Sequence, residues 1–335
     1  MTSRKRTLGI VAVAVSMITV LAGCAGSGTS TSAAGEELEK VRFGYIGDFN
    51  GTSLLAVAED QGFWEENGLD VETSVFTNGP LQIQALGTGD LDFGYIGPGA
   101  MWLPASGQAK VVAINTLGNA DRVIAQPGIT SIADLKGKKI AVPEGTSGDM
   151  VLTLALESAG MTKADVEIVP MDAATVVSAF SSGQVDAAGI WYPLISTIKQ
   201  QVPELTELAK NADFADSVSF PTAFVSGIDV ATEKPETVAK VLAALRQAMD
   251  YRAENTDETI ALTATMLKLE KDAVAADAKN SEVLTSAELD GYTEDGTIDK
   301  WFTGMNDYFV GAGKLPAPVD PSTYYLGDEF VTAGK

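Results

Sequence analysis

The residues best placed to do chemistry in this chain lie in two turns that open predicted helices. Gly99 and Ala100 follow Pro98, and Thr146 and Ser147 precede a helical pattern. The first backbone N–H groups of a helix have no partner inside it, so they suit an anionic oxygen. The hydroxyls of Thr146 and Ser147 add two donors. The alternative interpretations are ordinary N-capping by these hydroxyls and a plain tight turn around Pro98.

Carboxylates close to the predicted turns bear on whether the ligand also carries an amine. Asp48, Glu144 and Asp172 are placed to pair with an amine, which a zwitterionic ligand would require. Most carboxylates in so acidic a chain are solvated, so each also fits a plain surface charge. Arg122 is a possible partner for an anion, but the neighbouring Asp121 favours an ion pair between the two.

Cys24, the single cysteine, ends an apolar run over residues 8–22 that follows three cations at positions 4–6. This pattern predicts a secretory signal peptide over residues 1–23. The run is shorter than the ~20 apolar residues of a membrane-spanning helix. Its end resembles a lipobox, so we expect Cys24 to be lipid-modified, the alternative being an ordinary signal peptide. Residues 24–39, small and polar at first, predict a flexible tether.

The composition of the 335 residues argues against catalysis. The chain has no histidine and a net charge of −22, or −25 without the three cations of the signal peptide. Serine–histidine and cysteine–histidine nucleophiles and histidine-based zinc sites are therefore excluded. Motifs for phosphate loops, nucleophile elbows and calcium loops are also missing. The acidic balance argues against nucleic acid and anionic lipid as partners. We predict no enzymatic activity, no cofactor and no metal.

Strand and helix patterns alternate along the chain in two similar passes. The first pass has strands over 41–46, 69–76 and 91–96, with helices over 54–62 and 81–86. The second has strands over 138–142, 166–169 and 185–191, with helices over 148–159 and 173–180. Alternation of this kind predicts two α/β lobes, with a ligand at the carboxyl ends of their strands.

The predicted domain organisation follows from these two passes. Lobe one comprises residues 40–128 and 219–335, and lobe two residues 129–218, with crossings near 126–130 and 216–222. Amphipathic patterns over 233–254, 256–269 and 298–310 predict a helical C-terminal portion.

Three motifs carry a resemblance to a known family. They are Gly89–Pro98 (GDLDFGYIGP), Ile132–Pro143 (IADLKGKKIAVP) and Gly183–Asp186 (GQVD) with Trp191. They resemble solute-binding proteins of ABC importers, and among these the nitrate, sulfonate and taurine type, over roughly residues 41–331. The resemblance implies a periplasmic-binding-protein-like (type II) fold whose two lobes close about a hinge. It also implies a monomer that docks on a membrane permease and a lipid anchor on the outer face of the cell membrane.

Carried over by motif, the resemblance marks four ligand-binding turns. They are Asp48, Phe49, Asn50, Gly51 and Thr52; Gly97, Pro98, Gly99 and Ala100; Glu144, Gly145, Thr146 and Ser147; and Trp191 and Tyr192. Asp172 joins the candidate site only as an acid close to a turn. Trp191 fits a wall against a short carbon chain, or a core position.

We therefore predict an extracytoplasmic lipoprotein that captures a small sulfonate such as taurine or an alkanesulfonate. Taurine binders tend to have an acid soon after the motif found here as Pro221-Thr222, whereas Ala223 and Phe224 follow in this chain. This departure leaves an alkanesulfonate without an amine as a second candidate. Nitrate, bicarbonate, a pyrimidine precursor or an aromatic acid would also suit the same fold. A secreted hydrolase using Glu144 and Asp172 and a structural lipoprotein are the competing functions outside the binding class.

Overall fold

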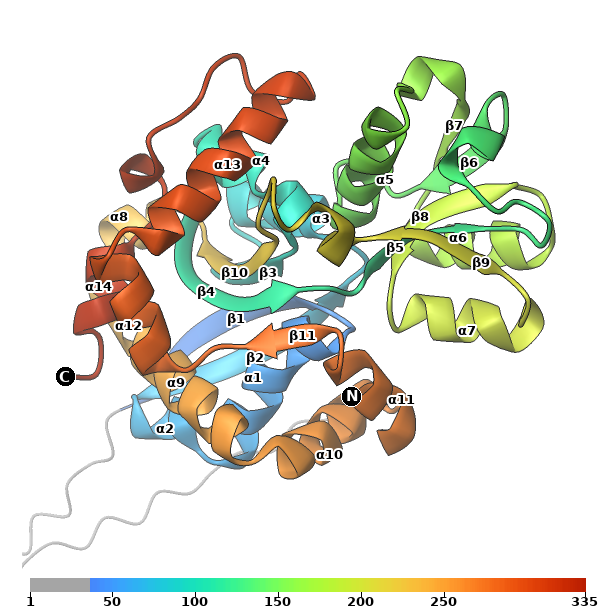
Figure 1. Cartoon of the computed structure of the whole chain (residues 1–335). Coiled ribbons are helices and arrows are strands. Elements are labelled where there is room, and N and C mark those ends of the chain that lie inside the picture. The colour runs from blue at the N-terminus through green and yellow to red at the C-terminus, as the bar shows by residue number, and fades with distance from the viewer. Residues whose placement is uncertain (1–36) are drawn as a thin grey trace, which may run out of the picture. The chain divides into compact units, whose positions relative to one another are not determined.

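The computed structural model describes residues 37–335, and two mixed β-sheets organise them (Figure 1). The predicted signal peptide, Cys24 and all but the last three residues of the predicted tether lie outside the described residues. The first sheet has the order β11 (Ser281–Val283), β4 (Lys110–Gly118), β10 (Pro221–Ser226), β3 (Phe93–Ile96), β1 (Glu39–Ile46) and β2 (Leu69–Phe76). The second has the order β7 (Glu167–Pro170), β6 (Lys139–Val142), β8 (Ala187–Trp191), β5 (Asp121–Ala125) and β9 (Thr206–Lys210).

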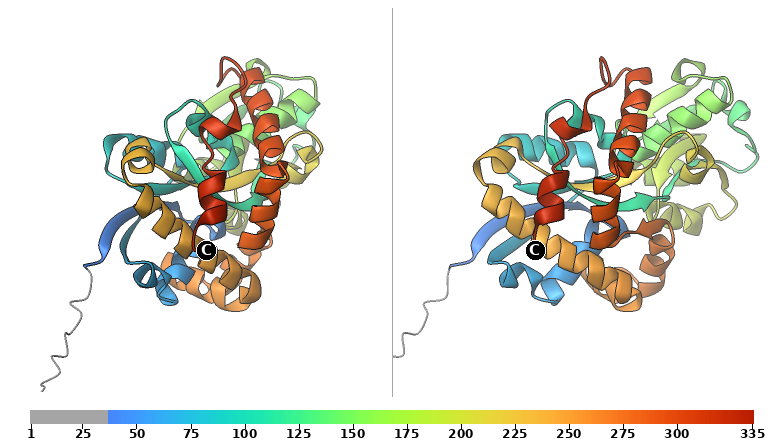
Figure 2. Two further views of the ribbon diagram at one scale, coloured as in Figure 1. Left: turned by 90° about the vertical axis from the view of Figure 1, so that its left-hand side faces the viewer. Right: turned by 60° about the vertical axis from the view of Figure 1, so that its left-hand side comes forward.

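Helices surround both sheets, and those of the C-terminal portion gather around the first sheet (Figure 2). The first half of the chain supplies α1 (Phe49–Asp60), α2 (Phe63–Glu66), α3 (Gly79–Thr88), the 3₁₀ helix η1 (Pro98–Ala100) and α4 (Trp102–Ala105). The second lobe supplies η2 (Ile132–Leu135), α5 (Ser147–Ser158), η3 (Lys163–Asp165), α6 (Ala173–Ser181), α7 (Leu194–Gln201) and η4 (Asn211–Phe214). The C-terminal portion supplies α8 (Ile228–Glu233), α9 (Pro235–Glu254), α10 (Thr256–Leu267), α11 (Lys271–Ala278), α12 (Ser286–Glu294), α13 (Thr297–Gly311), η5 (Pro321–Thr323) and α14 (Gly327–Thr332).

Strand direction explains why loops from distant parts of the chain meet. In the first sheet β1 runs parallel to β2 and β3, while β10 and β4 run antiparallel to their neighbours. In the second sheet β6 runs parallel to β7 and β8, and β5 runs antiparallel to β8. The carboxyl ends of the parallel strands therefore share an edge with the start of β10 in one sheet and of β5 in the other.

Buried, apolar strands hold these edges in place. Every residue of β3, β5, β8 and β10 is buried. Such continuous burial is typical of strands covered by helices on both faces. In the first sheet Phe43 stacks on Phe93 and meets Phe224 edge-on, with ring centroids 5.7 Å and 5.5 Å apart. The strands that position the site are thus central strands in a dry core.

The two-lobed α/β fold predicted from the sequence is confirmed, but the chain enters the second sheet earlier than expected. Because β5 pairs with β8 and β9, the first crossing runs through Asn119 and Ala120 and not near residues 126–130. The second crossing lies between η4 and β10, in the region predicted. The boundary at residue 128 is therefore wrong for β5, which belongs to the second sheet, and the boundary at residue 219 stays a prediction. Within residues 37–335 no helix combines the length and apolar character that a membrane crossing requires.

Candidate functional site between the lobes

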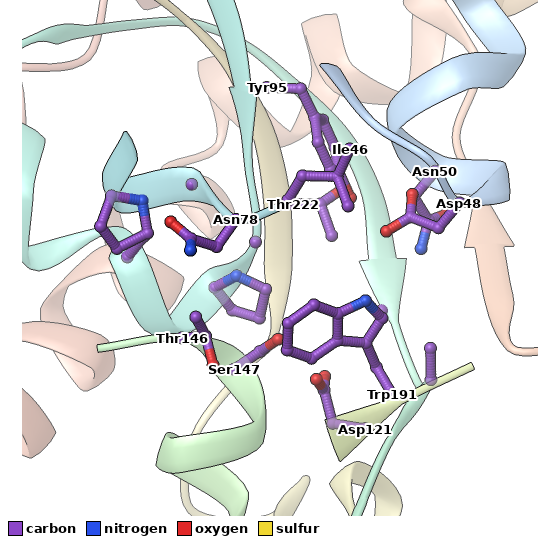
Figure 3. A pocket seen from close by; sticks show the side chains of 17 residues that line it. Ile46, Asp48, Asn50, Asn78, Tyr95, Asp121, Thr146, Ser147, Trp191 and Thr222 are labelled. Atoms are coloured by element: carbon purple, nitrogen blue, oxygen red, sulfur yellow. The ribbon is translucent and has the colours of Figure 1, made fainter. Parts of the chain in front are cut away.

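A small cavity lies between the facing edges of the two sheets (Figure 3). Its volume is about 40 Å³. At ~10–15 Å³ for each water, it has room for about three water molecules, so it suits a compact ligand. The lining residues are Ile46, Asp48, Asn50, Asn78, Gly79, Pro80, Tyr95, Gly97, Pro98, Ala100, Gly118, Ala120, Asp121, Thr146, Ser147, Trp191 and Thr222.

Three helices begin at the cavity, but at two of them the first N–H groups already have partners: Asn78 caps α3, and the Ala100 N–H of η1 donates to the carbonyl of Gly97. α3 starts at Gly79 after β2, η1 starts at Pro98 after β3, and α5 starts at Ser147 after β6. Thr146 occupies the N-cap position of α5, but its side chain does not cap the helix. Its hydroxyl donates instead to the carbonyl of Pro143 at 2.6 Å. The N-capping alternative therefore does not account for Thr146, and the start of α5 has no side-chain cap.

The start of α1, by contrast, is already occupied by carboxylates of the chain. Asp48 is its N-cap, and Oδ1 of Asp48 accepts a hydrogen bond from the Gly51 N–H at 2.6 Å. Oδ2 of Asp277 accepts a hydrogen bond from the Phe49 N–H at 2.7 Å. An anionic ligand would meet negative charge here, so its natural place is near the uncapped start of α5.

Asp121 is the second carboxylate of the cavity, at the first position of β5. It is 3% exposed, and its Oδ2 accepts a hydrogen bond from Nδ2 of Asn211 at 2.9 Å. Among the described residues Oδ1 of Asp121 has no hydrogen-bond partner. Burial raises the pKa of Asp121, although the nearby Ser147 hydroxyl and Asn211 oppose the shift. A buried carboxylate oxygen without a donor is costly, and a ligand that donates a hydrogen bond would satisfy it.

The ion pair expected between Arg122 and Asp121 is wrong. Nε of Arg122 pairs with Oε2 of Glu207 on β9 at 2.9 Å, and its Nη1 donates to the backbone carbonyl of Asp121. Side chains of adjacent residues in a strand point to opposite faces of the sheet. Arg122 therefore lies on the other face of the sheet from Asp121 and reaches Glu207 of β9 there, while Asp121 lines the cavity.

Burial also shifts the pKa of Asp48. Burial, together with the charges of Asp277 and Asp121, raises the pKa of Asp48 well above its ordinary value. In Figure 3, Asp48 and Asn50 lie on one side of the cavity and Asn78 and Thr146 on the other, with Trp191 and Asp121 between them. Asp48 thus lies on the side away from the start of α5, whereas Asp121 lies between the two sides, near the Ser147 hydroxyl.

A hydrogen-bond network behind the cavity fixes its polar wall. Nδ2 of Asn115 donates to the carbonyl of Asn50 at 2.6 Å, and Oδ1 of Asn115 accepts from Nη1 of Arg252 at 2.8 Å. Thr116 donates to Oδ1 of Asn50 at 3.1 Å and lies 2.8 Å from the Thr222 hydroxyl. Arg252 is 1% exposed and has no carboxylate partner among the described residues. Burial lowers the pKa of Arg252 to about 9.

The backbones of the two lobes are in close contact beside the cavity. A methyl group added to Gly99 of η1 would lie 2.1 Å from the carbonyl carbon and oxygen of Thr146. It would also lie 2.4 Å from the amide nitrogen of Ser147. A methyl group on Gly97 would lie 3.4 Å from the Ser147 hydroxyl. Backbone from the first lobe therefore packs directly on backbone from the second.

The structure brings half of the predicted site residues to the cavity. These are Asp48, Asn50, Gly97, Pro98, Ala100, Thr146, Ser147 and Trp191. Three others hold α1 in place: Phe49 packs with Ile260, Ala264 and Val274, Gly51 lies close against the carbonyl of Ile46, and Thr52 donates to that carbonyl. Gly99 and Gly145 lie at the contact between the lobes.

The remaining three predicted residues point elsewhere. Glu144 is exposed. Asp172 is exposed and caps α6, its Oδ1 accepting from the Thr175 N–H at 3.0 Å. The Tyr192 hydroxyl donates to Oε1 of Glu207 at 2.6 Å. None of these three lines the cavity, so the structure offers them other roles.

Sequence reasoning missed nine lining residues. They are Ile46, Asn78, Gly79, Pro80, Tyr95, Gly118, Ala120, Asp121 and Thr222. A signal existed for Asn78 to Pro80, because an N-cap residue followed by Gly-Pro after a predicted strand indicates a helix start at the strand's carboxyl end. Asp121 and Thr222 belong to antiparallel strands that the sequence pattern did not place.

Comparison with known proteins shows the family. Residues 50–259 match the model of the family described as NMT1/THI5 like, and the chain belongs to that family. A protein of Brucella abortus, whose name describes it as a binding protein and states no ligand, is 57% identical over 290 residues, covering 87% of this chain and 91% of its own. The taurine-binding periplasmic protein of Escherichia coli is 26% identical, covering 81% of this chain and 87% of its own.

A solved structure supports the same fold. The periplasmic aliphatic sulphonate binding protein SsuA of Escherichia coli superposes with a TM-score of 0.65 at 22% identity. The match covers 87% of this chain and 99% of that chain. The family predicted from the three motifs, and its two-lobed binding-protein fold, are therefore confirmed.

Proposed function

We propose that this chain is the extracytoplasmic substrate-binding protein of an ABC importer and that its ligand is a small amino sulfonate such as taurine. The observation that carries the proposal is a pair of buried carboxylates, Asp48 and Asp121, facing a cavity that has no lysine or arginine among its described lining residues. A ligand carrying only negative charge would gain no cationic partner there. A ligand with an ammonium group would compensate both carboxylates.

The opposite side of the cavity suits the sulfonate. The start of α5 has no side-chain cap, so it supplies backbone N–H groups and the positive end of a twelve-residue helix. The start of α3 is capped by Asn78, and in η1 the Ala100 N–H already donates to the carbonyl of Gly97. A sulfonate has three oxygens that accept hydrogen bonds from several directions. The names of the relatives, taurine-binding and aliphatic sulphonate binding, support the same assignment.

The size of the cavity and its walls support a short carbon chain. A volume of about 40 Å³ suits a compact ligand better than an aromatic or pyrimidine ring. Trp191, 6% exposed at the end of β8, offers an apolar face between the two sides. The acid that taurine binders tend to carry after Pro-Thr is absent here, and Asp121 on the neighbouring lobe takes its place in this proposal.

The test is calorimetric titration with taurine and with ethanesulfonate, which keeps the sulfonate and lacks the amine. We expect the wild type to prefer taurine. Asp121→Asn should weaken taurine binding by roughly 30-fold, since removing one partner of a buried charge pair costs about 2 kcal/mol or more, and should leave ethanesulfonate binding unchanged. Asp172→Asn, an exposed helix cap away from the cavity, is the matched control and should change neither affinity.

Two results would contradict this proposal. If the wild type binds ethanesulfonate more tightly than taurine, the carboxylates do not recognise an ammonium group. A bound ligand raises the melting temperature by mass action. If nitrate, bicarbonate or a pyrimidine raises it in a thermal-shift screen and no sulfonate does, the ligand is not a sulfonate.

The N-terminal pattern and the relatives support a location outside the membrane. We propose that Cys24 is acylated, which tethers the folded body to the outer face of the membrane, where it delivers the solute to a permease as a monomer. Cys24→Ser should release full-length, ligand-competent protein into the medium, detected by fractionation and mass spectrometry of the N-terminal peptide. A wild-type N-terminal peptide with no lipid mass would contradict the anchor.

A further inference from the structure

Asp277, a residue outside the cavity, shares the start of α1 with Asp48. It lies on α11, 228 residues from Phe49, whose N–H donates to its Oδ2 at 2.7 Å. Asp48 accepts from the Gly51 N–H two residues further along the same helix start. Asp277 is 4% exposed and Asp48 is 8% exposed. Two buried carboxyl groups thus face one helix terminus, one of them open to the ligand and the other behind it.

Within residues 37–335 no cation forms an ion pair with either carboxyl group. The charges that act on Asp48 are those of Asp277 and of Asp121 on β5, and the charges of all three carboxyl groups also raise the pKa of Tyr95 on β3. Arg122, the arginine next to Asp121, is held by Glu207. The charged residues flanking α11 and those at the start of α10 are not among the groups that shift either carboxyl.

Two adjacent, buried carboxyl groups without a cation do not both ionise. About half a unit of positive charge at a helix start, shared between them, offsets only part of the repulsion. Burial raises the pKa of Asp277 to about 7, and burial with the charge of Asp277 raises that of Asp48. At neutral pH the pair therefore holds a proton.

We propose that ligand binding is coupled to proton release: the ammonium group of the ligand takes the place of the proton that Asp48 and Asp277 share, and that proton leaves to solvent. The exchange balances in charge, because one positive charge enters as one leaves. This inference rests on the proposed amino sulfonate ligand. Asp277 never touches the ligand in this account, and it acts as a positioning residue that sets the protonation of Asp48.

The sign of the pH dependence follows directly. Because protons compete with the ammonium group, taurine should bind more weakly as the pH falls. Release of one proton corresponds to about a tenfold change in dissociation constant for each pH unit. Because the pKa of Asp277 is about 7, its proton is mostly bound at pH 6 and mostly lost at pH 8, so between these values we expect a loss of affinity of about tenfold. Ethanesulfonate, which has no ammonium group, should show no such loss.

The experiment is calorimetric titration of the full chain with taurine at pH 6, 7 and 8, each in two buffers of different ionisation enthalpy, which counts the protons released. We expect about half a proton for each taurine at pH 7, rising toward one at pH 6, because the pKa of Asp277 is about 7. In Asp277→Asn the count should fall and the affinity at pH 6 should approach that at pH 8, because Asp48 then ionises without a charged neighbour. The amide oxygen of asparagine can still accept the Phe49 N–H.

The outcomes separate this inference from the proposed function. Tight taurine binding with a pH-independent dissociation constant and no proton release would overturn the inference alone, and this measurement needs only the wild type. The same proton count in Asp277→Asn as in the wild type would assign the proton to Asp121 and overturn the role of Asp277. Absence of taurine binding at every pH would refute the proposed function and the inference with it.

Discussion

Gly99→Ala tests whether the ligand is held by closure of the lobes. The backbone of Gly99 does not lie in the left-handed region, so alanine is compatible with the local conformation. The added methyl group, however, would lie 2.1 Å from the carbonyl of Thr146 in the opposite lobe. An ordinary contact at that point begins near 3.4 Å, so the two backbones must separate by about 1.3 Å.

The cost in affinity follows from what the separation breaks. A shift of this size takes the Ser147 amide and the start of α5 out of hydrogen-bond distance from a sulfonate seated on the first lobe. A hydrogen bond to a charged group contributes about 1.5–3 kcal/mol, so losing two of them removes about 3 kcal/mol or more. At about 1.4 kcal/mol for each factor of ten, the dissociation constant for taurine should rise by roughly 100-fold.

Calorimetric titration measures the affinity, and melting without ligand measures whether the lobes still fold. Gly87→Ala is the matched control, because Gly87 lies in α3 of the same lobe and a methyl group there meets nothing within 4 Å. It should keep full affinity and melt slightly higher, since alanine favours a helix over glycine. Affinity of Gly99→Ala within about threefold of the control would refute the reasoning that closure of these backbones holds the ligand.

Two further predictions concern stability and the apolar wall. The pKa of Asp277 is raised to about 7 in the folded chain. Below that value the folded state binds more protons than the unfolded state. The melting temperature of the unliganded protein should therefore fall as the pH rises from 5 to 7. Asp277→Asn should flatten this slope, and an unchanged slope would show that other groups cause it. Trp191→Ala should destabilise the chain by about 3 kcal/mol. It should also weaken taurine binding more than Asp172→Asn does. If the melting temperature falls but the affinity stays intact, Trp191 is a core residue only.

The fold was predictable from the sequence where the pattern is local. Strands and helices of the parallel units, such as β1, β2, α5 and α6, follow from apolar periodicity and from turn residues at their ends. Each parallel unit also brings its own turn to the carboxyl edge of a sheet, and for that reason Asn50, Ala100 and Ser147 line the cavity. The antiparallel strands β4, β5 and β10 lack such a local signature, because their partners lie far away in the chain.

The charge of the cavity depends on those antiparallel strands and on a contact across the chain. Asp121 reaches the cavity because β5 runs antiparallel to β8, which puts its first residue beside Trp191. Asp277 reaches α1 through a hydrogen bond that spans 228 residues. Glu144 and Asp172 stand closer in sequence to predicted turns, yet both are exposed. A carboxylate in a chain of net charge −22 is informative only when it is buried, and burial is set by the tertiary contacts. The carboxylates that carry the proposed recognition of an amine are therefore those that sequence position alone could not single out.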